Sequence, residues 1–181
     1  MRLAFPPDRG LAIYEGLRPS LDVFVVTWVG DSLLSRAIKR FAPGGSHSSL
    51  GIKICDSVFL VEALEWGVDI KRASDRFDDY NGAILIHPIN CDKALGLRIK
   101  VTALRMVAQR KAFRYGYLSL VRRIWGKFRV TMGRPICSQT VAYILGKHGI
   151  IAPQESVLSP GELRAILPAP WRLAPYSKEA D

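Results

Sequence analysis

The segments that read as β-strands are grouped in the first half of the chain, and this grouping most limits the folds available to it. Predicted strands cover residues 23–29, 48–54, 58–64, 67–70 and 83–89, because each is a short β-rich or alternating apolar run bounded by turn residues. Strands that follow one another with few helices between them favour an antiparallel sheet. The sequence therefore predicts an α+β fold with a small antiparallel sheet or barrel.

The second half of the chain has helical periodicity. Five apolar residues recur at spacings of 3, 4, 3 and 4 and define one face of a helix: Ala94, Leu97, Val101, Leu104 and Ala108. A later helix is predicted to open at Pro135 and to end near Gly146 and Gly149, since proline suits a first helical position. Shorter helices are predicted over 33–41 and 159–163.

The length of 181 residues fits one domain over residues 1–181, with 1–20 as an irregular lead-in and 175–181 as a frayed tail. Cys55, Cys91 and Cys137 are scattered and odd in number, which argues against a disulfide framework. No cofactor and no metal site are predicted from this pattern. The start of the chain does not resemble a signal peptide, so we expect a cytoplasmic protein unless another system exports it.

Positive charge is concentrated in one part of the sequence. Lys and Arg number 26 against 16 Asp and Glu, and no acidic residue occurs between Lys93 and Gln154. The basic segment from Lys93 to Lys147 is therefore expected to contact an anionic polymer or a lipid headgroup, unless it is only a solvated face. No specific nucleic-acid motif accompanies the charge, and no apolar stretch approaches the ~20 residues of a transmembrane segment.

Cys137 is the cysteine whose setting favours reactivity. It lies in the first turn of a predicted helix, directly after Arg134-Pro135-Ile136. A helix N-terminus and nearby cations stabilise the thiolate, which is the nucleophilic form of cysteine. Backbone N–H groups at that turn would also help to hold an oxyanion.

A cysteine nucleophile needs a general base, and two of the three histidines can serve. His148 lies 11 residues along the predicted Cys137 helix, about 16 Å away, and is excluded. His87 stays open. His47 is preferred because it begins a strand after a Pro-Gly-Gly break, and the small polar residues Ser46, Ser48 and Ser49 beside it leave room for a substrate.

The orienting acid is expected to be Glu62, which lies inside an apolar strand where a carboxylate needs a partner. If Asp56-Ser57 forms a two-residue turn, however, Glu62 lies opposite Gly51. It would then be offset by about 13 Å from His47, since a strand rises about 3.3 Å per residue. A bulge or a longer loop would bring the two together, and Glu65 is the alternative acid in the tight register.

These motifs together resemble the circularly permuted branch of the NlpC-type, papain-like cysteine peptidases. In that branch the order is His, acid, Cys, as it is here. The resemblance covers roughly residues 22–163, with Ser-His-Ser-Ser in place of the small apolar residue that many relatives carry after the histidine. It rests on the following segments: Gly30–Ile38, Ser46–Ile52, Val61–Ala63, Tyr115–Tyr117, Cys137–Tyr143 and Ser159–Leu163.

The resemblance implies a circularly permuted papain-like fold, with the sheet packed against the Cys-bearing helix. It implies a Cys137–His47–Glu62 triad, and substrate contacts from Ser46, Ser48 and Tyr117. The expected function is a thiol hydrolase that cleaves a peptide or isopeptide-like amide, peptidoglycan among the candidates, through an acyl-enzyme. The alternatives are a lipid acyl hydrolase or acyltransferase with the same triad, and a non-catalytic module that binds an anionic ligand.

Overall fold

The computed structural model describes residues 21–30, 47–64, 67–78, 80, 82–109, 137–152 and 158–173. Within these ranges six strands form one antiparallel sheet in the order β4-β3-β2-β1-β5-β6. The strands are β1 (Val23–Gly30), β2 (His47–Ile54), β3 (Ser57–Leu64), β4 (Gly67–Arg72), β5 (Gly82–Pro88) and β6 (Trp171–Leu173). The helices are α3 (Ala73–Asp78), α4 (Lys93–Ala108), α6 (Cys137–Lys147) and α7 (Pro160–Ile166). The predicted α+β class is confirmed.

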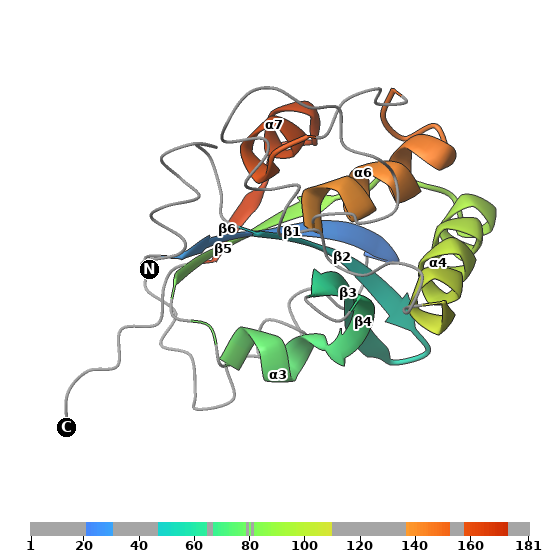
Figure 1. Ribbon diagram of the computed structural model, residues 1–181, viewed down its shortest axis with the longest axis horizontal. Helices are drawn as coiled ribbons and strands as arrows, with labels where there is room; N and C mark the ends of the chain where they lie inside the picture. Colours follow the sequence, from blue (N-terminus) through green and yellow to red (C-terminus); the bar gives the residue numbers. More distant parts are fainter. Residues whose placement is uncertain are drawn as a thin grey trace.

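Helices cover both faces of the sheet, as Figure 1 shows, with α6 and α7 on one face and α3 on the other. The central strand β1 is therefore buried on both sides. Its residues Val23 and Val25 belong to the core beneath α4, α6 and α7, whereas Phe24, Val26 and Trp28 belong to the core beneath α3. This alternation explains why β1 reads as a continuous apolar run rather than as an amphipathic strand.

The β2–β3 hairpin corrects one sequence prediction. The turn consists of Cys55 and Asp56, not Asp56 and Ser57, because Ile54 pairs with Ser57. Cys55 adopts φ 53°, a left-handed conformation that the two-residue connection requires. Moving the turn by one residue shifts the pairing of the two strands by two residues, so Glu62 lies two residues nearer the start of β2 than predicted.

Gly51 has a packing role in the same hairpin. It pairs with Phe24 of β1, and a Cβ atom at Gly51 would lie 2.3 Å from the Phe24 ring. The aromatic ring occupies the space that a side chain would take. A larger residue at position 51 would therefore force the ring or the strands to move.

Several further elements agree with the sequence or extend it. The helix after residue 158 begins with a capping box, in which Ser159 and Glu162 exchange hydrogen bonds, as the predicted short helix required. Helix α6 is described from Cys137 onward, so Pro135 lies outside the described residues, as do the predicted 33–41 helix and residues 1–20 and 175–181. The short helix α3 and the three-residue strand β6 have no counterpart in the sequence predictions.

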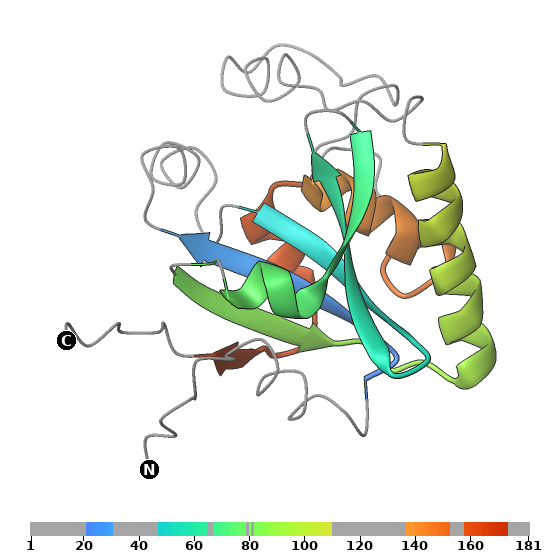
Figure 2. The ribbon, with the colours of Figure 1, turned by 90° about the horizontal axis from the view of Figure 1, so that it is seen from below.

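Helix α4 forms as predicted and contacts β1, β4 and α6, and Figure 2 shows it beside α6 and the sheet. Its predicted apolar face, however, points outward. The residues that α4 buries are Gly96, Ile99, Thr102, Ala103 and Met106, whereas Leu97 is 61% exposed and both Val101 and Leu104 are 38% exposed. The described structure thus leaves an apolar stripe on the outer side of α4.

Candidate active site

Cys137 is the first residue of α6 and is buried. The first backbone N–H groups of a helix have no intrahelical acceptor, so they point at this end of the helix. The backbone N–H groups of Ser48 and Ser138 donate hydrogen bonds to the Cys137 sulfur. The Ser138 hydroxyl donates to the carbonyl of Leu158, which ties this first turn to the segment that leads into α7. The sequence prediction that Cys137 lies in a first helical turn is confirmed.

His47 is the first residue of β2 and its side chain is 22% exposed. Its Nε2 atom lies 3.6 Å from Oε1 of Glu62, an ion-pair distance. Its ring also interacts with Cys137 through a side-chain hydrogen bond and through charge. Because Nε2 faces Glu62, we infer that Nδ1 is the ring nitrogen that hydrogen-bonds to the sulfur. The structure therefore brings together the three residues that the sequence singled out.

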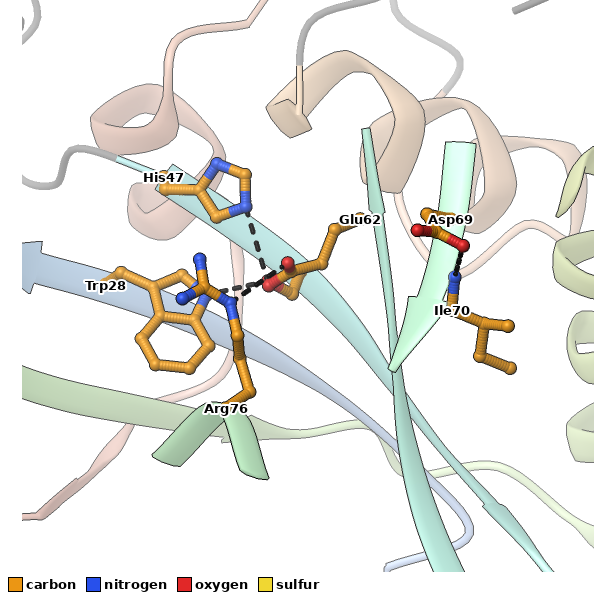
Figure 3. A network of polar contacts seen from close by, with 7 residues as sticks. Trp28, His47, Glu62, Asp69, Ile70 and Arg76 are labelled. Carbon is orange, nitrogen blue, oxygen red and sulfur yellow. Dashed lines mark hydrogen bonds and ion pairs between the residues drawn. The ribbon is translucent and has the colours of Figure 1, made fainter. Parts of the chain in front are cut away.

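The Glu62 carboxylate is 1% exposed and is held from several sides, as Figure 3 shows. Ser49 donates to Oε1 at 2.6 Å, and the indole N–H of Trp28 donates to the Ser49 hydroxyl at 2.6 Å. Arg76 of α3 donates from Nε to Oε2 at 3.2 Å. A buried carboxylate is stable only when it is paired and hydrogen-bonded, and these contacts meet that condition.

The revised hairpin register explains how Glu62 reaches His47. Extending the observed pairing places Glu62 opposite Ser49, which lies two residues from His47 on the same side of β2. The offset along the strand is then about 7 Å rather than about 13 Å, a gap that two side chains can span. Neither a bulge nor a longer loop is needed. Glu65, the alternative acid, lies outside the described residues.

Electrostatics favour an ionised triad. Burial would lower the pKa of His47, but the charge of Cys137, the hydrogen bond to it and the Glu62 carboxylate raise the pKa to about 10. Burial would raise the pKa of Cys137, but His47 and the two backbone N–H donors lower it below its usual value. Burial would also raise the pKa of Glu62, yet His47, Arg76 and Ser49 lower it to about 2. The three shifts act together and favour a thiolate, an imidazolium and a carboxylate over the neutral forms.

The other two histidines have different surroundings. His87 is fully buried, its Nδ1 lies 2.8 Å from the carbonyl oxygen of Pro168, and its Nε2 lies 3.3 Å from Oγ1 of Thr27. His148 lies 2.8 Å from the hydroxyl of Thr102 on α4, in agreement with its exclusion as a base. Both histidines make contacts that tie elements together.

Some of the remaining predicted site residues are described by the structure, and others are not. Ser48 is buried and contributes a backbone N–H to Cys137, while a substrate contact from it stays a prediction. Ser49, expected to leave room for a substrate, binds Glu62 instead. Ser46 and Tyr117, the other two predicted substrate contacts, lie outside the described residues. Cys55 is exposed in the hairpin turn.

Sequence reasoning missed Arg76 and Trp28. Arg76 is placed by its neighbour Phe77, which is buried against Trp28 with ring centroids 5.7 Å apart. The Arg76 guanidinium also lies over the Trp28 ring, 5.2 Å from its centroid. The sequence signal was indirect: an acid inside an apolar strand requires partners, but nothing in the pattern indicates which residues they are.

Comparison with known proteins identifies the fold but no family. No family model and no curated protein matches the chain. Among solved structures, the chain is similar to the crystal structure of the metalloprotein yiiX from Escherichia coli O157:H7, described as DUF1105. The two share 14% identity with a TM-score of 0.64, over 87% of this chain and 98% of yiiX. At this identity the likeness concerns the fold.

Two kinds of structure are absent from the described residues. No group of three or more His, Cys, Asp or Glu side chains in the described ranges is arranged so that it could hold a metal ion. Within the same ranges, no helix has the length and apolar character needed to cross a membrane.

Proposed function

We propose that this protein is a thiol hydrolase that cleaves an amide bond through an acyl-enzyme on Cys137. The observation that carries the proposal is the chain of contacts from Cys137 to His47 and from His47 to the buried carboxylate of Glu62. A nucleophile, a base within hydrogen-bond reach and a group that orients the base are the parts that this chemistry needs. We propose further that the α+β fold is a circularly permuted papain-like fold, with the acid and base preceding the nucleophile in sequence.

The proposed reaction uses each member of the triad in turn. The Cys137 thiolate attacks the carbonyl carbon of the amide, and the oxyanion that forms is stabilised by backbone N–H groups at the start of α6. The C–N bond then breaks, and the His47 imidazolium gives its proton to the leaving amine. Water attacks the thioester while His47 takes up one of its protons, which releases the carboxylic acid and restores the thiolate.

Glu62 has a positioning role in this scheme. It holds the imidazole by its Nε2 side, which directs Nδ1 to the sulfur and stabilises the positive charge that the ring carries. Peptide and isopeptide-like amides, including those of peptidoglycan, are the substrates proposed here, and a lipid ester would react through the same thioester.

The first test is the reactivity of Cys137. We expect iodoacetamide to label Cys137 at a pH well below the ~8.5 at which an unperturbed thiol titrates, because His47 stabilises the thiolate. The labelling rate would be measured against pH by mass spectrometry of the separate cysteine peptides. Cys55, which is exposed in the same molecule, serves as the reference thiol.

A substrate panel follows from the labelling. Chromogenic amides and esters would be tested with the wild type and with Cys137→Ala, and turnover should vanish in the variant. Labelling of Cys137 that follows an ordinary thiol titration would contradict the proposal and would favour a non-catalytic binding module.

A further inference from the structure

The outer side of α4 carries an apolar stripe along its whole length. Leu97, Val101 and Leu104 are its large members, and the exposed residues Ala94 and Ala108 extend it at both ends. These residues recur every three or four positions, so they lie on one line along the helix. The opposite side of α4 is already buried against the sheet and α6. The stripe is therefore not part of the core that the described residues form.

Cations flank this stripe on both sides. At about 100° of rotation per residue, Arg98 and Arg105 follow one edge of the stripe, and Lys93 and Lys100 follow the other. Lys93, Arg98 and Arg105 are exposed, while Lys100 pairs with Asp22 at 3.2 Å. No acidic residue occurs in α4 itself. An apolar line between two basic edges is the pattern of a helix that lies on an anionic membrane surface.

Charge argues against the other ways of covering the stripe. A second copy would place the three exposed cations of one α4 against those of the other, with no acid on either helix to pair with them. The next part of this chain, residues 110–136, is also basic and contains no acid. The phosphates of a nucleic acid would pair with the cations but would not bury the apolar side chains of Leu97, Val101 and Leu104. An anionic lipid surface satisfies both features.

We propose that α4 is a membrane-docking helix that binds the surface of bilayers containing anionic lipids. The stripe enters the boundary between headgroups and acyl chains, and the stems of the flanking Lys and Arg side chains lie along it while their charged ends reach the phosphates. The protein would bind as a peripheral protein, and the proposal does not depend on which bond Cys137 attacks.

The test is co-sedimentation of the protein with vesicles of two compositions. We expect binding to vesicles that contain phosphatidylglycerol and phosphatidylcholine, and little binding to pure phosphatidylcholine. The double variant Leu97→Gln/Leu104→Gln should bind about tenfold more weakly or worse, since it removes the largest apolar groups. Gln is close to Leu in helix propensity, and both positions are exposed, so the helix should be retained.

The control and the contrary outcomes are equally specific. Ile166→Gln removes an apolar side chain that is exposed on α7, and it should leave vesicle binding unchanged. Equal vesicle binding by the wild type and the α4 double variant would overturn the proposal. It would also be overturned if the wild type forms a dimer and the double variant is a monomer. Tight DNA binding without vesicle binding would be a third contrary result. Iodoacetamide labelling of Cys137 in the same samples shows separately whether the proposed active site is intact.

Discussion

Two histidines on the strands next to β1 differ in the state that their surroundings favour. His47 at the start of β2 faces a thiol and a carboxylate, and its pKa is raised to about 10. His87 near the end of β5 is more deeply buried and faces a carbonyl and a hydroxyl. Burial, together with the charge of Arg164, lowers the pKa of His87, although the Pro168 carbonyl opposes this.

The comparison shows that burial alone does not decide whether a histidine is charged. Desolvation is the largest influence on both rings and acts in the same direction on both. The difference comes from the partners. Anionic groups beside His47 outweigh the desolvation cost, whereas His87 has only the Pro168 carbonyl to oppose burial and the charge of Arg164. His47 is thereby suited to proton transfer, and His87 to joining β5 with the segment before β6.

The largest expected effect is on the rate of Cys137 alkylation, which should depend on His47 and not on His87. In His47→Gln, the rate of Cys137 alkylation at pH 6.5 should fall about 100-fold, because a thiol with a pKa near 8.5 is only about one per cent ionised there. In His87→Gln the Cys137 alkylation profile should stay where it is in the wild type. The measurement is peptide-resolved iodoacetamide labelling, with near-ultraviolet circular dichroism to verify that each variant is folded. A larger effect in His87→Gln would reverse the assignment of the base.

Replacing the acid Glu62 should have a smaller effect on the rate of Cys137 alkylation. Glu62→Gln keeps the shape of the side chain but removes the charge that stabilises the imidazolium, so Cys137 alkylation at pH 6.5 should fall about tenfold. The apparent pKa of the thiol, read from the pH profile, should rise. An unchanged profile would show that Glu62 is only a structural partner of Ser49 and Arg76.

Arg76 should have a weaker influence, because its side chain is 31% exposed and acts through Glu62. We expect Arg76→Gln to shift the alkylation profile of Cys137 upward and to slow labelling by about threefold, since solvent screens a partly exposed pair. Arg72→Gln, at an exposed position of β4, is the matched loss of one positive charge. Arg76→Lys should restore part of the effect, which a merely steric role would not produce. Equal shifts in both Gln variants would indicate a general charge effect.

The smallest expected effect is on the pH dependence of folding stability, and it tests whether His87 is neutral in the folded protein. Because the folded-state pKa of His87 is lowered, the unfolded chain binds a proton more readily than the folded chain. The contribution of His87 to stability is therefore complete above about pH 6.5 and is lost as the pH falls below that value. Urea unfolding of His87→Gln should show a weaker loss of stability between pH 7 and 5 than the wild type shows. An equal loss would mean that His87 is protonated in the folded protein.

Local sequence patterns were sufficient for the parts of the site that depend on one element. Cys137 could be placed in a first helical turn because Pro135 and the apolar spacing after it define a helix start without reference to other elements. His47 could be placed at the start of a strand by the glycine pair before it. The capping box at Ser159 was readable for the same reason, since both partners lie within four residues.

Patterns failed where two elements had to be aligned or packed. The predicted hairpin turn was wrong by one residue, because Cys55 adopts a left-handed conformation that is uncommon for cysteine and that its residue type does not predict. That single residue decides whether Glu62 lies near His47 or beyond its reach. The exposure of the apolar stripe on α4 could not be predicted either, since apolar spacing defines one face of a helix but does not show whether that face is buried.

The sequence by itself determined the α+β class, the helix that carries Cys137 and the presence of an acid that needs partners. The tertiary structure decided which partners they are: Ser49 from the adjacent strand, and Arg76 from a six-residue helix held by Phe77. The physical reason is that periodicity and capping act over a few residues, whereas strand register and the packing of α3 on Trp28 bring together groups that are far apart in the chain.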